Sequence, residues 1–205
     1  DIGGTTATAL RKFEKTGDPF SGPTDPQNSG NGSLMRLAPV PMFYFPNRDA
    51  MITWSAESSR TTHGSSECLD ACRFFASVLF NAFYGMDKEK VLFEHDEKIV
   101  DSPRILDILR GVYREKTEVQ IKGDGYVVRS LEAALWCFLK TESYHDAVLM
   151  AANLGDDADT TAAICGQVAG AYYGRCGLIK HWDSLLFMRD EISLLAMKLL
   201  QKQPL

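Results

Sequence analysis

Three carboxylates within four residues, Asp156, Asp157 and Asp159, stand directly before a small, mostly apolar segment that favours a helix. Residues two apart in an α-helix point about 200° away from each other, so Asp157 and Asp159 cannot both face one ligand from inside a regular helix. We therefore expect them at a helix N-terminus, where free N–H groups and the positive end of the dipole stabilise negative charge. A single Asp there is commonly a cap, but a cap uses only one side chain.

A divalent cation would remove the repulsion that remains among these acids. Magnesium prefers carboxylate and hydroxyl oxygens and keeps several waters, and Asp157, Asp159 and Thr160 offer that ligand set. An EF-hand calcium loop does not fit, because counting from Asp157 puts Ala162 at the position that needs Gly and Val168 at the position that needs Glu. The acidic cluster therefore predicts a magnesium site.

A second candidate is the tract in which Gly30, Asn31, Gly32 and Ser33 precede a predicted helix. Open backbone N–H groups at the first turn of that helix would bind an anion such as a phosphate. The alternative is an ordinary capped helix with Ser33 as its N-cap. His63 lies in a turn between two predicted helices, where it is either structural or a donor to a bound sugar or phosphate.

Length and composition limit the other classes of function. A chain of 205 residues is long enough for one domain with a full core. The net charge of −5, with interspersed signs and no basic stripe, argues against a nucleic-acid partner, and no apolar run reaches the ~18 residues of a membrane span. The five cysteines lack the spacing of a zinc site and predict a reducing, cytoplasmic protein. Because the chain opens on Asp1 rather than Met, we expect further residues upstream.

Hydrophobic periodicity predicts an all-α fold, a compact multi-helix single domain over residues 1–205. Apolar residues recur at i, i+3, i+4 and i+7, for example over residues 131–138. Residues 16–33 are expected to form a long loop, and residues 126–128 are the one convincing extended segment. The predicted helices cover residues 2–13, 34–44, 48–60, 65–83, 88–93, 103–111, 130–139, 144–153, 160–173 and 191–200.

The chain resembles the ADP-ribosylglycohydrolase family, which includes the dinitrogenase reductase-activating glycohydrolases. The resemblance covers nearly the whole chain, in the family's order and spacing. It rests on residues 1–6 (DIGGTT), 17–20 (GDPF), 30–39 (GNGSLMRLAP), 59–63 (SRTTH), 125–127 (GYV) with 131–136 (LEAALW), and 153–160 (NLGDDADT).

This resemblance implies an all-α globule with two magnesium ions in a cleft, or manganese in their place, where ADP-ribose is cleaved from a modified protein side chain or a related ADP-ribosyl compound. The implied metal ligands are Asp157, Asp159 and Thr160, with Asp156 behind them in a supporting role. The implied substrate contacts are Gly30, Asn31, Gly32 and Ser33 at the diphosphate and ribose, His63 in the same cleft, and Gly125 and Tyr126 near the adenosine.

The chain departs from the family pattern in two places. The family's other metal ligands, a Thr-Asp-Asp-Thr type motif, and the acidic residue that serves as base in some members would precede Asp1. No catalytic residue is therefore assigned, and we expect this piece alone to be inactive. The second departure is Arg129, where relatives often have an acid.

Two alternatives stay open at this point. An HD-type metal-dependent phosphohydrolase, also all-α, would use His63, His145, Asp146 and Asp159, although His145 falls on a polar face of its predicted helix. A non-catalytic ADP-ribose-binding or structural relative, such as the related lens crystallins, is the other alternative, and retention of the acidic cluster argues against it. The linkage that is cut, N-glycosidic to arginine or O-glycosidic to serine, is not decided by these motifs.

Overall fold

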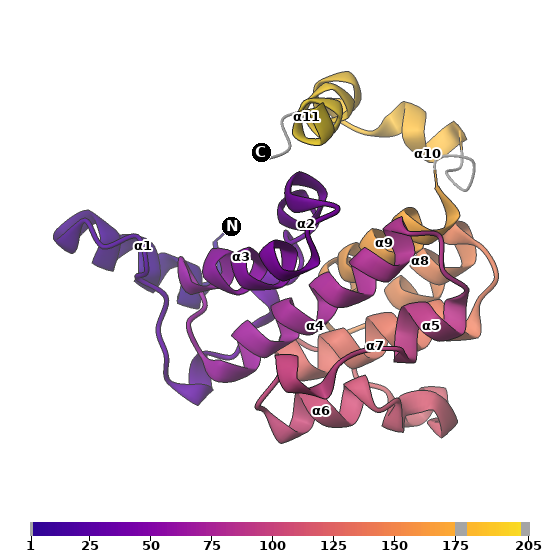
Figure 1. Cartoon of the computed structure of the whole chain (residues 1–205), viewed down its shortest axis with the longest axis horizontal. Helices are drawn as coiled ribbons and strands as arrows, with labels where there is room; N and C mark the ends of the chain where they lie inside the picture. Colours follow the sequence, from indigo (N-terminus) through magenta and orange to yellow (C-terminus); the bar gives the residue numbers. More distant parts are fainter. Residues whose placement is uncertain (1, 175–179, 202–205) are drawn as a thin grey trace.

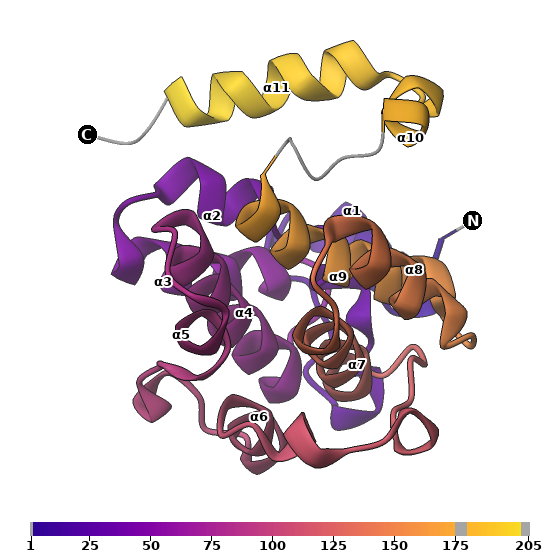
Figure 2. The ribbon, with the colours of Figure 1, turned by 90° about the vertical axis from the view of Figure 1, so that its right-hand side faces the viewer.

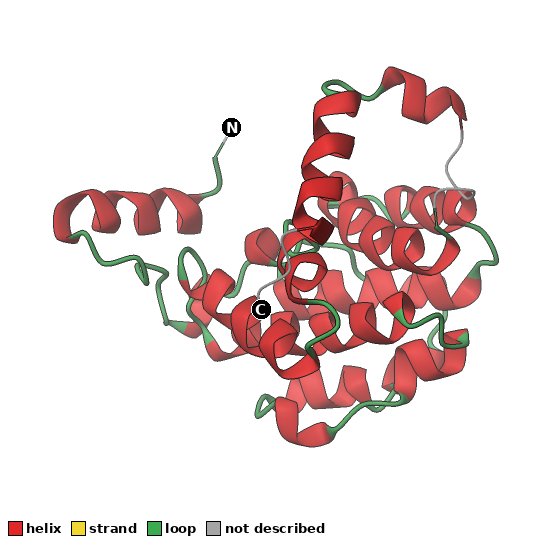
Figure 3. Ribbon diagram, turned by 45° about the horizontal axis from the view of Figure 1, so that its top comes forward, coloured by secondary structure: helices red, strands yellow, loops and turns green. Residues whose placement is uncertain are grey.

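The computed structural model describes residues 2–174 and 180–201, and over these residues the chain is all-α, as predicted (Figure 1). No strand forms in the described part (Figure 3). The one β-type pairing there is an isolated antiparallel bridge between Gly30 and Tyr126. The α-helices are α1 (Gly4–Thr16), α2 (Pro39–Tyr44), α3 (Arg48–Arg60), α4 (Ser66–Phe83), α5 (Lys88–Phe93), α6 (Pro103–Leu109), α7 (Val127–Lys140), α8 (Tyr144–Asn153), α9 (Ala158–Tyr173), α10 (Lys180–Leu185) and α11 (Arg189–Gln201).

Helix α4 lies at the centre of the molecule (Figure 1). The side chain of Ser65 caps it by accepting a hydrogen bond from the N–H of Cys68, an interaction typically worth ~1 kcal/mol. Phe74 and Phe75 are adjacent in sequence and point in different directions, yet both are fully buried. A helix that is apolar around most of its circumference is a core helix, and α4 accordingly packs against α3, α5, α6, α7 and α9.

The turn between α8 and α9 brings the acidic cluster to a helix N-terminus. Gly155 and Asp156 have φ values of +80° and +52°, left-handed conformations that Gly adopts freely and that Asp tolerates better than most residues. These two residues reverse the chain, so that Asp157 takes the N-cap position of α9. The N–H of Asp157 donates to the Gly123 carbonyl over 2.9 Å, which ties this turn to the loop before α7.

The first and last helices lie at the periphery. Helix α1 stands off from the main body in Figures 1 and 3, and Ala9 is its one buried residue. Helix α11 crosses over α2 (Figure 2), and many of its apolar side chains remain about half exposed. Among the described helices, none combines the length and the apolar character that crossing a membrane would need.

Two predicted elements are only partly correct. In the segment predicted to be extended, Tyr126 is extended, but Val127 and Val128 form the first turn of α7. Burying a Val side chain is worth about 1.5–3 kcal/mol, more than the few tenths that a β-branched residue costs in a helix. The helix predicted from residue 34 begins only at Pro39, because a proline lacks the N–H that the interior of a helix requires.

Four cysteines, Cys68, Cys72, Cys137 and Cys165, are free and buried, whereas Cys176 lies outside the described residues. Burial raises the pKa of the Cys68 thiol to about 12 and that of Cys72 to about 11. These thiols are therefore protonated at neutral pH and act as small core residues rather than as nucleophiles.

Candidate active site

A cleft of about 340 Å³ lies where four segments meet: the start of α1, the loop before α2, the turn after α3 and the N-terminus of α9. Six of the predicted site residues line it, namely Gly30, Asn31, Gly32, His63, Asp157 and Thr160. The other predicted residues, Ser33, Gly125, Tyr126, Asp156 and Asp159, do not line it. Residues from three predicted motifs therefore line one cleft, and the other five predicted site residues lie outside its lining.

Asn31 connects these segments. Its backbone N–H donates to the Gly125 carbonyl over 3.1 Å. Its side-chain NH₂ donates to Ser130 Oγ over 2.8 Å and to Asp157 Oδ2 over 2.7 Å, so that both amide hydrogens are used. Asn31 is buried, and it therefore joins the glycine loop, the start of α7 and the acidic cluster in one network.

The acidic cluster sits on the N-terminal turn of α9, as predicted, but its members differ in role. Asp157 occupies the N-cap position without making a capping bond, and its carboxylate instead accepts from Asn31. Asp159 is exposed, and its Oδ1 accepts from the N–H of Thr160 over 2.8 Å. Asp156 is exposed and precedes the N-cap residue, so it does not cap α9.

The donor chemistry of this turn fits magnesium. Asp157, Asp159 and Thr160 supply only carboxylate and hydroxyl oxygens, which are the hard ligands that this ion prefers. Within the described ranges, no group of three or more His, Cys, Asp or Glu side chains is close enough to hold a metal ion. The chemistry of these three residues thus matches magnesium. Asp157 and Thr160 line the cleft whereas Asp159 does not, and the Thr160 hydroxyl lies 3.8 Å from Met35 Sδ.

The glycine loop is built differently from the prediction. Residues 31–33 form a short 3₁₀ turn, and the N–H groups of Leu34 and Met35 both donate to the Asn31 carbonyl rather than standing open. Ser33 is not an N-cap, since its side chain is buried and its Oγ lies 2.8 Å from Ser59 Oγ. The next helix, α2, begins only at Pro39, which lies in its first turn.

His63 forms a buried wall of the cleft. Burial lowers its pKa to about 4, with a smaller contribution in the same direction from the positive charge of Arg36. The imidazole is therefore neutral at pH 7. Gly32 packs directly against the ring, because a Cβ at this position would lie 2.8 Å from His63 Cε1.

Tyr126 lies beside the cleft and is oriented by charged neighbours. Its hydroxyl donates to Glu67 over 2.7 Å and accepts from Arg104 over 3.0 Å. The guanidinium of Arg129 lies 5.5 Å from the centre of the Tyr126 ring and pairs with Asp124 at 2.8 Å. Arg129 therefore has a local role, holding the loop before α7 through an ion pair and a cation–π contact.

Five lining residues lie inside the quoted motifs but received no site role. Residues 3–6 line the cleft from the start of α1, and Met35 lines it from the glycine loop. The run of small and hydroxyl residues GGTT at a helix start indicates such a role for the first group. No such signal marks Met35, because it is placed by Gln167 of α9, whose Nε2 donates to the Leu34 and Met35 carbonyls over 3.1 Å each.

The structure does not assemble the HD-type ligand set. His145 is half-buried on α8, where its ring contacts Trp182 and its Nδ1 lies 3.1 Å from Asp146. His63 lines the cleft instead, and no His, Cys, Asp or Glu group suited to a metal forms in the part of the chain that the structure describes.

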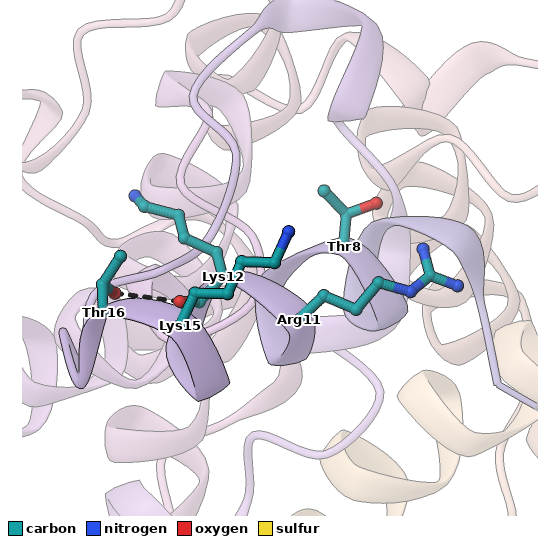
Figure 4. A pocket seen from close by; sticks show the side chains of 5 residues that line it. All are labelled: Thr8, Arg11, Lys12, Lys15 and Thr16. Carbon is teal, nitrogen blue, oxygen red and sulfur yellow. Dashed lines mark hydrogen bonds between the residues drawn. The ribbon is translucent and has the colours of Figure 1, made fainter.

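A second cavity, of about 390 Å³, lies along α1 (Figure 4). Every residue that lines it belongs to this one helix: Thr8, Arg11, Lys12, Lys15 and Thr16. It is therefore the open space beside a basic helix surface rather than a cleft between elements, and it shares no residue with the predicted motifs.

Comparison with known proteins identifies relatives of the whole chain. The chain is 38% identical over 205 residues to an ADP-ribosylarginine hydrolase Tri1 of Serratia proteamaculans, covering 100% of this chain and 55% of that protein. It is 39% identical to the protein of the same name from Pseudomonas putida, covering 100% and 54%, and 25% identical to the ADP-ribosyl-[dinitrogen reductase] glycohydrolase of Rhodospirillum rubrum, covering 93% and 62%. The chain thus spans about half the length of the first two of these relatives.

A solved structure described as an ADP-ribosylglycohydrolase-related protein complex superposes with a TM-score of 0.89 at 36% identity, covering 98% of this chain and 70% of that one. The sequence model of the ADP-ribosylglycohydrolase family matches residues 1–205. Together these matches show that the chain belongs to the ADP-ribosylglycohydrolase family.

Proposed function

We propose that the cleft binds ADP-ribose and that the chain serves magnesium-dependent hydrolysis of ADP-ribosylated side chains. One observation carries this proposal: the loop expected to hold the diphosphate is hydrogen-bonded, through Asn31, to the expected metal ligand Asp157. A diphosphate against this loop would lie next to a cation on Asp157, so the two charges would stabilise each other.

Each residue of the cleft has a defined part in this scheme. Asn31 orients the Asp157 carboxylate, and the Thr160 hydroxyl lies in the cleft wall beside it. His63 is neutral, so it offers a hydrogen bond to the ligand without adding charge. Divalent ions, when bound, would polarise ribose hydroxyls and lower the pKa of a bound water.

We propose the arginine linkage as the preferred substrate. The two relatives at 38% and 39% identity are both named ADP-ribosylarginine hydrolases. A mouse relative at 24% identity is named an ADP-ribosylhydrolase, a name that specifies no amino acid. A second candidate function, ADP-ribose binding without turnover, is supported by the partial metal-ligand set of the described residues.

The test combines binding and turnover. The chain is titrated with ADP-ribose in millimolar MgCl₂ by calorimetry and is then incubated with ADP-ribosyl-arginine and ADP-ribosyl-serine peptides, with release of free ADP-ribose as the readout. Asp157→Asn should weaken binding, while Asp107→Asn, at an exposed position of α6, should not. Release of ADP-ribose would support the hydrolase and contradict the expectation that this piece alone is inactive. Binding without release agrees with both candidate functions, and absence of binding by the unmodified chain would contradict both.

A further inference from the structure

Arg36, Thr62 and His63 form a short chain of hydrogen bonds beneath the cleft. Arg36 Nη2 donates to Thr62 Oγ1 over 2.9 Å, and Thr62 Oγ1 lies 2.9 Å from His63 Nδ1. The same guanidinium nitrogen also donates to the Ser58 carbonyl and to Thr61 Oγ1, each over 3.3 Å. Several partners on one turn therefore fix the position of Arg36.

The chemistry of these groups sets the direction of the chain. A guanidinium can only donate, so Thr62 Oγ1 must accept from Arg36, and its single proton remains free to donate onward. The nearest acceptor is His63 Nδ1. The opposite tautomer, with the ring proton on Nδ1, would leave the Thr62 hydroxyl proton without a partner among the described residues.

The other ring nitrogen faces the cleft. A Cβ on Gly32 would lie 3.1 Å from His63 Nε2 and one on Gly30 would lie 3.5 Å from it, and both glycines line the cleft. Nε2 has no hydrogen-bond partner within the described part of the chain. It is also not one of the fully buried polar atoms there that lack a partner, which are Ser55 Oγ and the Tyr113 hydroxyl, so its surface is accessible. It is therefore available to a bound molecule.

Burial and the charge of Arg36 both lower the pKa of His63, to about 4, so the ring carries a single proton at pH 7. One proton shared between two nitrogens makes the choice of tautomer decisive, because it determines whether the cleft meets a donor or an acceptor.

We propose that Arg36 and Thr62 are positioning residues that hold His63 as the tautomer protonated on Nε2, so that this wall of the cleft presents a hydrogen-bond donor. The part that concerns the ligand rests on the proposed function: an anionic, oxygen-rich molecule such as ADP-ribose accepts hydrogen bonds and would be bound by Nε2–H, whereas an unprotonated Nε2 would repel its oxygens.

The tautomer can be measured without any ligand. The chain is labelled with ¹⁵N-histidine, and long-range ¹H–¹⁵N correlation at pH 7.5 distinguishes the protonated from the unprotonated ring nitrogen. The His63 signals are identified by their loss in His63→Gln. The unmodified chain and Thr62→Ser should show the proton on Nε2, and Thr62→Val, which removes the hydroxyl, should shift the population towards Nδ1–H. A proton on Nδ1 in the unmodified chain, or an unchanged tautomer in Thr62→Val, would overturn the proposal.

Affinity for ADP-ribose supplies the second readout. Thr62→Val should raise the Kd at least about tenfold, as expected for the loss of one hydrogen bond to a charged group, and Thr62→Ser should restore it to within about twofold. If Thr62→Val changed the tautomer but left the affinity unchanged, the claim that His63 Nε2–H donates a hydrogen bond to the ligand would be overturned. If the unmodified chain bound no ADP-ribose, the proposed function would fail, and the spectra would still decide the role of Thr62.

Discussion

The side-chain amide of Asn31 donates to Asp157 Oδ2 over 2.7 Å and so joins two residues that lie 126 positions apart in sequence. The same amide group donates to Ser130, at the start of α7. One buried side chain therefore fixes the glycine loop relative to the N-terminus of α9, and the shape of the cleft depends on it.

Replacing Asn31 by Ala should cost about 1.5–3 kcal/mol of unfolding free energy, because it leaves Asp157 without a charge-assisted hydrogen bond and Ser130 without a donor. Urea denaturation measures this change. The control is Asn153→Ala, at an exposed position of α8, which should change stability by less than about 0.5 kcal/mol. Equal effects of the two substitutions would show that the Asn31 network does not stabilise the fold.

The close approach of Gly32 to His63 gives a second prediction. Gly32→Ala would place a methyl group 2.8 Å from His63 Cε1, so the ring must move, and ADP-ribose affinity should fall at least tenfold. Gly170→Ala in α9 is the matched control, since this residue does not line the cleft and its Cβ would lie 3.8 Å from the Tyr144 ring, an ordinary contact. Calorimetric titration compares the two variants, and equal affinities would contradict the proposed role of this wall.

The fold class and much of the site could be predicted from the sequence, for local reasons. Helical periodicity shows directly in the apolar residues of α4 and α7. Asp157 and Asp159 could be placed at a helix start because residues two apart inside a helix point in nearly opposite directions. Family motifs led to six residues that line one cleft.

The remaining features depend on contacts between distant segments, which a single sequence does not encode locally. Nothing near Arg36 indicates that it contacts Thr62, and nothing near Met35 indicates that Gln167 holds it in the cleft wall. Of the extended segment predicted at residues 126–128, Tyr126 is extended, whereas Val127 and Val128 enter α7, because burial of Val127 against the core outweighs its local preference.

Gln167 links α9 to the turn before α2, and its loss should affect ligand binding as well as stability. Its Oε1 accepts from the Ala38 N–H over 2.7 Å, and its Nε2 donates to two carbonyls of the same turn. Gln167→Met keeps the length of the side chain but removes all three bonds, and we expect a loss of about 1–3 kcal/mol in urea denaturation. Gln27→Met, at an exposed position, should have no such effect.

The pH dependence of stability should report the burial of His63. Its pKa is about 4 in the folded state, lowered by burial and by Arg36, and about 6.5 in the unfolded chain. Between these values the unfolded state binds the proton more tightly, so stability falls as the pH drops from 6.5 towards 4. His95, whose pKa is also lowered to about 4, chiefly by burial, contributes in the same direction.

His63→Gln should therefore reduce the loss of stability between pH 7 and pH 4.5, by on the order of 2 kcal/mol, relative to the unmodified chain. Urea denaturation at the two pH values measures the difference. His181→Gln, at an exposed position of α10, serves as the control and should leave the pH dependence unchanged. The same pH dependence in His63→Gln as in the unmodified chain would mean that His63 is not held neutral by the fold.

The metal site can be tested with Mn²⁺ in place of magnesium, since the electron paramagnetic resonance signal of the free ion reports binding directly. The unmodified chain should bind with a Kd in the millimolar range, because two carboxylates and one hydroxyl leave most of the coordination shell to water. Asp157→Asn and Asp159→Asn should each weaken binding at least fivefold, whereas Asp107→Asn should not. Without metal, Asp159→Asn should be as stable as the unmodified chain or slightly more stable, because it removes a repelling charge from this turn. Asp157→Asn also removes the charge that strengthens the hydrogen bond from Asn31, so it should be less stable than Asp159→Asn. If either variant bound Mn²⁺ as the unmodified chain does, that residue would not be a ligand.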